Sequence, residues 1–398
     1  MALLRLALLA LTLAGCGAPA PAPATRGRDA AMAALVVAQV PAQLRAAWAG
    51  YKQDFIQGDG RVIDPGRAGV TTSEGQSYAL LRAVWMDDHA TFDRVWAWTQ
   101  HNLRVRGDAL FGYLWGERPD RQWSILSTSS ATDADEDIAL ALIFARYRWG
   151  MSLYMRQAAA ILHDIWRREV ADVRGQPYLT AGDWGPSWEK GDVAIDPSYF
   201  APYAYRIFAR VAPSHPWLRL VDTSYRVLNA CTSSPLGERS SAGLPPNWCA
   251  LTRASGAVAP IHTIKMTDAY GYDAFRVMWR IALDYEWNKE PRARTYLERS
   301  AFLRQQWQRK GVLLAVYGHD GTPLTTQEDL TVYGGDIADF VVADPAAARV
   351  IAARKLLPAF RRSAGAAYWG QQYSYYEQNW IWLGLALVDG QLSQLARG

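Results

Sequence analysis

Apolar side chains recur at helical spacing along most of the chain, and this periodicity constrains the fold more than any other feature. Beyond Leu35, apolar positions repeat with a helical period in the stretches 92–103, 138–149, 153–170, 199–211, 217–228, 274–285, 292–308, 337–354 and 379–387. Loops with glycine and proline separate these stretches, whereas alternating strand patterns are scarce. About a dozen helices without an internal break in composition predict a single all-α domain. Helix pairs in this number can close into a toroid whose loops line a groove at one end.

Tryptophan and tyrosine dominate the aromatic residues of the chain. The 398 residues include 18 Trp and 20 Tyr but only 10 Phe. Trp and Tyr combine a flat apolar face with a polar edge, so this excess favours a groove that stacks on sugar rings, although wide helix–helix interfaces also use Trp. The net charge of +4 is spread along the chain without a basic tract. We therefore expect no nucleic acid as a partner.

The first residues resemble an export signal. Residues 1–15 contain Arg5 and an apolar run that is too short to span a bilayer. The run ends at Cys16 in a bacterial lipobox pattern, so we expect Cys16 to carry a lipid; an ordinary secretory signal with an incidental cysteine is the alternative. Residues 16–35 include a Pro/Ala-rich spacer and are expected to form a linker, followed by a globular domain over 36–398. The protein is then exported to the periplasm or cell envelope and held by lipid alone, at the outer membrane.

The other two cysteines predict a disulfide bond. Cys231 and Cys249 lie close together in a stretch rich in glycine, proline and serine. In an exported protein such a pair favours a bridge, with a stabilisation of about 3 kcal/mol. Neither cysteine has a histidine at the spacing of a metal site, and we expect no metal and no cofactor.

A dense acidic cluster opens one of the predicted helices. Four carboxylates occur within residues 133–137, immediately before an apolar run that begins at Ile138. Ser129, Ser130 or Thr132 could cap this helix, and acidic residues suit its first turn. Taken alone, the cluster is compatible with a charged helix start, a cation site or a catalytic site.

A second carboxylate precedes an apolar helix at Glu74. Gly75 follows it, and the run from Tyr78 is apolar. Desolvation at such a position raises the pKa of a carboxyl group, as a general acid near neutral pH requires. The alternative is a capping-box glutamate behind Thr71.

Asp273 opens a third helix, with Arg276 one turn further on. The arginine can pair with Asp273 or hold it ionised, and a capping aspartate with a helical salt bridge is the alternative. Tyr199 lies between two prolines at another helix start. By itself it is more typical of packing than of catalysis.

Taken together, these segments resemble glycoside hydrolase family 8. The cluster and its helix fit the family signature throughout, and four further segments resemble its other motifs in the right order: 73–78, 197–199, 272–276 and 375–380. The resemblance runs from about Trp48 to Leu387. Residues 113–116 and Trp123 look most like the endoglucanases that accompany bacterial cellulose synthesis. Asp196 departs from the pattern, since relatives often have Asn there, and this can tune the charge of the groove.

The resemblance implies an (α/α)6 barrel with an open acidic groove and an inverting mechanism. Glu74 is then the general acid, and Asp273 is the general base, with Tyr199 holding the attacking water. The two carboxyl groups are expected about 6.5–9.5 Å apart, which leaves room for that water. Asp133 is expected to hold the sugar in the reacting subsite; some descriptions of the family call this aspartate the nucleophile, but an inverting reaction forms no covalent intermediate.

The resemblance also implies a set of sugar-binding residues. Arg276 is placed in this set together with four aromatic residues that are candidate stacking platforms or core residues: Trp115, Trp123, Trp184 and Tyr375. Asp135, Glu136 and Asp137 are expected to shape the charge of the groove or to cap their helix.

The expected substrate is a β-linked polysaccharide, foremost an unbranched β-1,4-glucan cut by an endo-acting enzyme. Chitosan, mixed-linkage glucan and xylan remain alternatives on the same fold. Two other classes also remain: a non-catalytic polysaccharide-binding lipoprotein and a cation-binding surface module built on residues 133–137. We expect a monomer and leave open a link to an exopolysaccharide synthesis and export complex.

Overall fold

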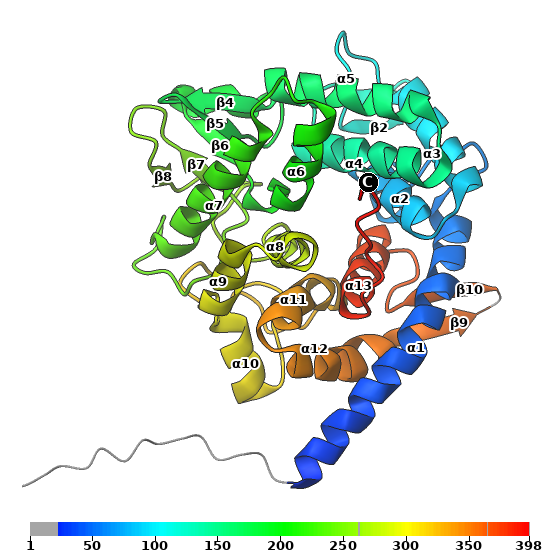
Figure 1. The fold of residues 1–398 in the computed structure, drawn as a ribbon, viewed down its shortest axis with the longest axis vertical. Coiled ribbons are helices and arrows are strands. Elements are labelled where there is room, and N and C mark those ends of the chain that lie inside the picture. The colour runs from blue at the N-terminus through cyan, green and yellow to red at the C-terminus, as the bar shows by residue number, and fades with distance from the viewer. Residues whose placement is uncertain (1–22, 262, 364, 398) are drawn as a thin grey trace, which may run out of the picture.

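Six helices that are buried along most of their length form an inner ring. They are α2 (Ser73–Trp85), α4 (Thr132–Trp149), α6 (Pro202–Val211), α8 (Phe275–Asn288), α11 (Leu330–Ala343) and α13 (Tyr375–Val388). Each contacts the next in chain order, and α13 contacts α2, which closes the ring (Figure 1). The computed structural model describes residues 23–261, 263–363 and 365–397.

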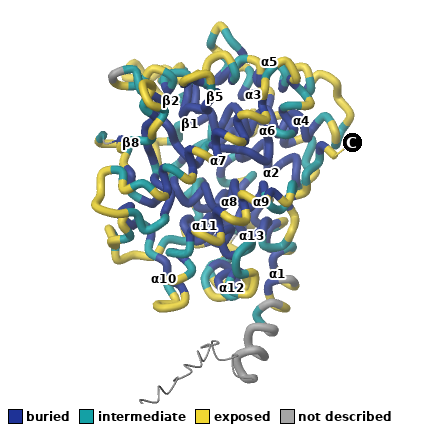
Figure 2. The backbone as a smooth tube through the Cα atoms, turned by 60° about the vertical axis from the view of Figure 1, so that its left-hand side comes forward, coloured by how far each residue is buried: buried dark blue, intermediate teal, exposed yellow. Residues whose placement is uncertain are grey.

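Each inner helix packs against an outer partner. The outer helices are α1 (Pro23–Phe55), α3 (His89–Asn102), α5 (Ser152–Arg168), α7 (Trp217–Ser233), α9 (Pro291–Arg299) and α12 (Pro345–Ile351). In α5 the buried residues recur at helical spacing from Tyr154 to Ile165, so only one face is apolar. Figure 2 shows the same contrast, with buried backbone at the centre and exposed backbone at the rim. The predicted (α/α)6 barrel is confirmed.

Two predicted helices are each divided in the structure. The stretch 292–308 forms α9 and α10 (Phe302–Lys310), separated at Ser300. The stretch 337–354 belongs to α11 and α12, followed by a π-helical turn over 352–356. Asp344 ends α11 and caps α12, and Pro345 stands in the first turn of α12, where a missing N–H costs nothing.

The N-terminal helix begins earlier than the sequence suggested. Helix α1 starts at Pro23, inside the range 16–35 that was expected to be a linker, and its side chains contact the hydrophobic core from Met32 onward. The predicted signal segment, Cys16 and the first part of the linker lie outside the described residues. None of the helices in the described part of the chain is long and apolar enough to cross a membrane.

Short antiparallel strands connect the helices. Three-stranded sheets comprise β1 (Thr71–Thr72), β2 (Leu114–Glu117) and β3 (Trp123–Ser127), and β6 (Val193–Ile195), β7 (Cys249–Leu251) and β8 (Val258–Ala259). Two hairpins join β4 (Val170–Val173) to β5 (Gln176–Leu179) and β9 (Phe360–Ser363) to β10 (Ala366–Trp369). In the first sheet Thr71 is opposite Trp115, and in the second Ile195 is opposite Cys249.

Two features fix neighbouring elements to each other. Helices α11 and α13 approach so closely that a Cβ on Gly384 would lie 2.0 Å from the carbonyl oxygen of Gly334. A disulfide bond joins Cys231 in α7 to Cys249 in β7, as the sequence predicted. The bridge ties an outer helix to the sheet that lies next to the functional site.

Candidate active site

The inner helices all begin at one end of the barrel, and the candidate residues lie there. Glu74 and Asp133 are the second residues of α2 and α4, and Tyr375 is the first residue of α13. Tyr199 ends a 3₁₀ turn just before α6, and Asp273 lies two residues before α8. Helix N-termini carry a partial positive charge, which favours carboxylates at this end.

A cavity of about 400 Å³ opens between these helix ends. It is lined by four residues with predicted catalytic roles, namely Glu74, Asp133, Tyr199 and Asp273. Other lining residues come from the loops around them: Tyr113, Ser127, Ser129, Ser130, Ala131, Ala181, Trp184, Trp248, Lys265, Met266 and Arg276. Segments as far apart in sequence as α2 and α8 therefore meet in one pocket.

Arg276 joins the acidic residues of the pocket to one another. Its side chain is 2% exposed, and all five of its N–H groups point to protein acceptors. Nη1 contacts the carboxylates of Glu74 at 3.1 Å and Asp133 at 3.2 Å, whereas Nη2 contacts Asp196 at 3.2 Å and Asp273 at 2.9 Å. Nε donates to the carbonyl oxygen of Asp273. The predicted pairing with Asp273 is present, but this geometry leaves Arg276 no donor for a sugar.

Glu74 occupies a largely desolvated position. Its side chain is 18% exposed, Oε2 accepts from Arg276, and Oε1 accepts from the Tyr375 hydroxyl at 2.6 Å. Burial raises the pKa of Glu74 above its ordinary value, Arg276 and Tyr375 oppose this, and the charge of Asp273 adds to it. The side chain is not a helix cap, because Thr72 caps α2 by accepting from Gly75 N–H.

Asp273 is the most exposed of the three pocket carboxylates on Arg276, with 36% of its side chain accessible. Oδ1 accepts from Arg276, and Oδ2 accepts from Trp248 Nε1 at 3.1 Å. The Asn247 side chain accepts from the backbone N–H groups of Asp273 and Ala274 and thus orders the start of α8. Asp273 is held in a fixed orientation while it stays open to water.

Asp133 and Tyr199 also lie close to Arg276. Asp133 accepts from Arg276 and from its neighbour Ala134 N–H, and burial raises its pKa to about 7, with Arg276 opposing and Glu74 adding to the shift. The Tyr199 ring lies 5.2 Å from the Arg276 guanidinium carbon. Burial and the nearby carboxylates raise the pKa of Tyr199 well above its usual range, so its hydroxyl keeps its proton.

The acidic cluster at the start of α4 divides into separate environments. Asp135 accepts from Phe111 N–H and lies beside Glu169, whereas Asp137 forms a bidentate pair with buried Arg280. Glu136 is fully buried, and burial raises its pKa well above the ordinary value. The expectation that these three residues cap the helix is therefore wrong, and none of them lines the cavity, although the charge of Asp137 helps to raise the pKa of Asp133 there. Ser129, Ser130 and Thr132 do not cap the helix either, because Ala131 occupies the N-cap without a side-chain bond.

The predicted stacking residues take different positions. Trp184 lines the cavity and lies 6.1 Å from Trp248 between ring centroids. Trp115 and Trp123 are on β2 and β3, outside the cavity lining, with the Arg61 guanidinium 4.3 and 4.4 Å from their rings. The Tyr375 hydroxyl is bonded to Glu74.

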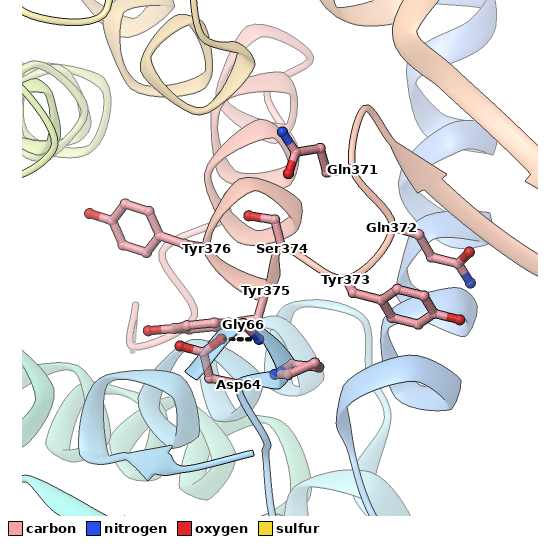
Figure 3. A pocket seen from close by; sticks show the side chains of 9 residues that line it. Asp64, Gly66, Gln371, Gln372, Tyr373, Ser374, Tyr375 and Tyr376 are labelled. Atoms are coloured by element: carbon pink, nitrogen blue, oxygen red, sulfur yellow. Dashed lines mark hydrogen bonds between the residues drawn. The ribbon is translucent and has the colours of Figure 1, made fainter. Parts of the chain in front are cut away.

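A second cavity, of about 660 Å³, adjoins Tyr375. Its lining comes from the turn at 64–66, from residues 371–374 between β10 and α13, and from the first two residues of α13. Figure 3 shows Tyr375 beside Asp64, whose carboxylate accepts from Gly66 N–H. Tyr375 thus lines this cavity while its hydroxyl reaches Glu74 in the first one.

Several residues of the site were not predicted from the sequence. Trp248 and Asn247 position Asp273, and Lys265 and Met266 line the cavity. All four lie in the loop region 243–271, which has no helical periodicity. The only available signal was Cys249, since a residue next to a disulfide is held rigidly.

The arrangement provides one largely desolvated carboxyl group with a raised pKa and one more accessible carboxyl group, on opposite amino groups of a single guanidinium. A carboxyl group with a raised pKa is suited to act as a general acid, and a carboxyl group that is open to water is placed to act as a general base. Tyr199 lines the same cavity.

Comparisons with known proteins identify relatives. The model of the glycosyl hydrolases of family 8 matches residues 23–318. The endoglucanase of Escherichia coli (strain K12) is 34% identical over 238 residues, which cover 58% of this chain and 61% of that protein. The chain thus aligns with about three fifths of the length of this relative.

Solved structures share the fold. The endo-1,4-D-glucanase from Vibrio fischeri ES114 superposes with a TM-score of 0.72 at 25% identity, over 85% of this chain and 93% of that chain. The β-1,3-1,4-glucanase from Paenibacillus sp. X4 superposes with a TM-score of 0.74 at 20% identity, over 89% and 93% of the two chains.

Proposed function

The chain belongs to glycosyl hydrolase family 8, and on this basis we propose that it is an endo-acting, inverting hydrolase of β-1,4-glucan. The relative in Escherichia coli and the neighbour in Vibrio fischeri, an endoglucanase and an endo-1,4-D-glucanase, support this substrate class. One observation carries the proposal most directly: Glu74 and Asp273 contact the same guanidinium in one cavity but differ twofold in side-chain exposure, 18% against 36%.

The proposed reaction follows from these environments. Glu74, with its raised pKa, donates a proton to the glycosidic oxygen as the bond to the anomeric carbon breaks. Asp273 removes a proton from a water molecule that attacks the opposite face of the sugar, and Tyr199 holds that water. Asp133 holds the hydroxyl groups of the reacting sugar. Arg276 fixes the relative positions of all three carboxylates.

The shared guanidinium limits the distance between the proposed acid and base. Glu74 and Asp273 are bridged by one guanidinium through contacts of 3.1 and 2.9 Å. Two hydrogen bonds and the width of a guanidinium limit the separation of the contacting oxygens to about 8 Å. The limit admits the lower part of the range of about 6.5–9.5 Å that inverting enzymes use, and also the separation of about 5–5.5 Å that retaining enzymes use. The stereochemistry of the product therefore decides between the two mechanisms.

Substitution of the acid and the base tests the proposal. Glu74→Gln and Asp273→Asn keep the shape of each side chain but remove its proton chemistry, so kcat on soluble cellulose derivatives falls by about 10²–10⁴-fold. Binding of cello-oligosaccharides, measured by calorimetry, persists. Glu298→Gln on the exposed surface of α9 is the matched control and keeps wild-type activity. Full activity in either site variant would remove the role assigned to that residue.

The stereochemistry of the first product tests inversion separately. NMR spectroscopy during digestion of a β-linked oligosaccharide shows the α-anomer first if the reaction inverts. An initial β-anomer refutes inversion but leaves hydrolysis itself in place. A digestion panel of carboxymethylcellulose, lichenan, xylan and chitosan then ranks the possible substrates.

We also propose that the enzyme works as a lipid-anchored monomer in the cell envelope, close to where an exopolysaccharide is exported. The lipobox ending at Cys16 supports this setting. Cys16→Ser releases the activity from the membrane fraction of expressing cells if Cys16 carries the anchor. Activity that stays with the membranes argues against it.

A further inference from the structure

Of the four carboxylates that contact Arg276 in the described part of the chain, Asp196 alone lies outside the cavity lining. Its side chain is fully buried, so it can act on a sugar in the cavity only through its neighbours. Oδ2 accepts from Arg276 Nη2 at 3.2 Å, and Oδ1 accepts from the backbone N–H and the hydroxyl of Ser198 at 2.8 and 2.6 Å. One side chain therefore holds the guanidinium with one oxygen and caps a turn with the other.

The turn that Asp196 caps carries Tyr199. It is a 3₁₀ turn over Pro197–Tyr199, and Tyr199 N–H donates to the Asp196 carbonyl oxygen at 3.1 Å. The Tyr199 ring lies 5.2 Å from the guanidinium carbon of Arg276. The Nη2 atom that contacts Asp196 also donates to Asp273 at 2.9 Å, so the two accepting oxygens are at most about 6 Å apart. Asp196 thus links the turn with Tyr199 to the group that holds Asp273.

The second three-stranded sheet brings Asp196 to this place. The last residue of β6 is opposite the first residue of β7, so Asp196 and Trp248, which adjoin them, leave the antiparallel pair at the same end. Trp248 donates to Asp273 Oδ2, whereas Asp196 accepts from Arg276. One strand pair, tied to α7 by the disulfide bond, therefore supplies two contacts to the surroundings of the proposed base.

We propose that Asp196 is a positioning residue, which keeps Tyr199 and Asp273 in a fixed relative position through Arg276. The inference rests on the proposed hydrolase function and adds a residue to it. In the proposed reaction Tyr199 holds the attacking water while Asp273 removes its proton, so the two side chains must keep their separation. A displacement of about 1 Å between groups that act together can cost about 10²-fold in rate. Asp196 itself touches neither the water nor the sugar.

Two double-mutant cycles test this link. In the first, kcat and KM on cellohexaose are measured for Asp196→Ala, Tyr199→Phe and the double variant. In the second, Tyr375→Phe replaces Tyr199→Phe, because the Tyr375 hydroxyl contacts the proposed acid, Glu74, and not the base. All values are taken at a pH below the alkaline limb of the profile.

We expect Asp196→Ala to lower kcat by about ten- to a hundredfold while KM stays within about twofold, since the link serves the transition state and not the binding of substrate. Asp196→Ala and Tyr199→Phe disturb the same arrangement, so the double variant loses little more kcat than the worse single variant. The effects of Asp196→Ala and Tyr375→Phe multiply, because these residues act on opposite members of the acid–base pair.

Asp196→Asn keeps the cycle available if Asp196→Ala does not fold. It preserves the volume of the side chain but offers one acceptor oxygen where the aspartate offers two, to Ser198 and to Arg276. Its kcat therefore falls less than that of Asp196→Ala, and its effect is again non-additive with Tyr199→Phe.

Asp284→Asn is the matched control. Asp284 is a fully buried aspartate of α8 that likewise accepts from an arginine, Arg206 at 2.9 Å, and from a hydroxyl, that of Tyr225 at 2.6 Å. It does not line the cavity. Asp284→Asn is expected to lower stability in denaturant unfolding but to keep the wild-type kcat and KM.

Three results overturn the inference: wild-type kcat in both Asp196 variants, a fall in kcat that is matched by a rise in KM, or effects of Asp196 and Tyr199 substitutions that simply multiply. In each case the wild-type protein still cuts cellohexaose, so the hydrolase function stands. A wild-type protein that binds cellohexaose but hydrolyses no glycan refutes the hydrolase function, and the role of Asp196 is refuted with it.

Discussion

The proton affinity of Glu74 is set by opposing contacts within a few ångströms. Burial raises its pKa, whereas the Arg276 guanidinium and the Tyr375 hydroxyl both stabilise the carboxylate and lower it. The proposed role of Glu74 as general acid requires its protonated form, so we expect activity to be lost as the pH rises through this pKa. The contact from Tyr375 therefore affects the alkaline limit of the enzyme.

Removal of that contact has a defined sign. In Tyr375→Phe the hydrogen bond of 2.6 Å to Glu74 is lost, the pKa of Glu74 rises further, and the alkaline limb of the kcat/KM profile moves to higher pH. Tyr376→Phe is the matched control, since the Tyr376 hydroxyl donates to the carbonyl oxygen of Tyr272 and not to Glu74. An unmoved or acid-shifted limb in Tyr375→Phe would contradict this assignment.

Individual residues were predicted unevenly from the sequence. The sequence placed Glu74, Asp133, Tyr199 and Asp273 at helix starts, and the structure brings them to one cavity. The use of all five donors of Arg276 was not predictable, because three of its partners are at least 80 positions away in the chain. Contacts of that range depend on closure of the ring and not on local pattern.

Among the helices, the pair α11 and α13 depends on glycine for its close packing. A Cβ at position 384 would lie 2.0 Å from the carbonyl oxygen of Gly334, which is backbone and cannot move aside. Gly384→Ala is therefore expected to destabilise the protein by about 2–4 kcal/mol, measured by denaturant unfolding. Gly58→Ala is the control, because a Cβ there meets nothing within 4 Å, and it changes stability by less than about 0.5 kcal/mol. If Gly384→Ala is as stable as the control, the two helices can move apart at little cost in free energy, which contradicts this prediction.

Helix positions followed from periodicity, but their boundaries did not. Apolar spacing continues across Asp344 and Pro345, so it joins α11 and α12, whereas the backbone turns there because the aspartate caps and the proline starts a new helix. The short strands were not predicted because a strand of two residues, such as β1, is too short to show an alternating pattern. β1 and β6 pair with strands more than 40 positions further along the chain, which local pattern cannot indicate.

The complete barrel encloses several carboxyl groups that burial keeps protonated. Burial raises the pKa of Glu169 from 4.5 to about 8, and it raises those of Asp135, Glu136 and Asp336 well above 3.8 or 4.5. A carboxyl group that is protonated in the folded protein but ionised in the unfolded chain lowers the free energy of unfolding as the pH rises. With respect to these groups, we therefore expect the free energy of unfolding to be highest below pH 3.8, the lower of the two ordinary pKa values.

For Glu169 the stabilising proton is fully present below pH 4.5 and is lost as the pH rises through about 8. Over this window the unfolding free energy falls by up to about 1.4 kcal/mol per pH unit for each such proton. Glu169→Gln retains an acceptor for the Ser130 hydroxyl and makes the fall shallower by one proton. Denaturant unfolding between pH 5 and pH 8 measures the slope, and exposed Glu298→Gln keeps the wild-type slope. Identical slopes in both variants would contradict a protonated Glu169.

Closure of the ring was expected only from the number of helices, together with the family resemblance. The structure closes it through α13 on α2, elements that are almost 300 residues apart. This closure also explains why the acidic cluster was misjudged. Asp137 pairs with Arg280, and Asp135 lies beside Glu169, only once the ring has formed.

The arrangement around Arg276 has a consequence for how such an enzyme can change over evolutionary time. One guanidinium serves four carboxylates, so a single substitution there disturbs acid, base and sugar contact together, and its effects on the four are not additive. Repairing the loss would need several simultaneous mutations. Exposed turns at the rim, such as the turn that carries Lys265, do not hold several functional groups in place at once. They therefore tolerate single substitutions. We therefore expect new substrate preferences to arise from substitutions in the rim turns. The non-additive effects of substitutions around Arg276 keep the centre of the site unchanged.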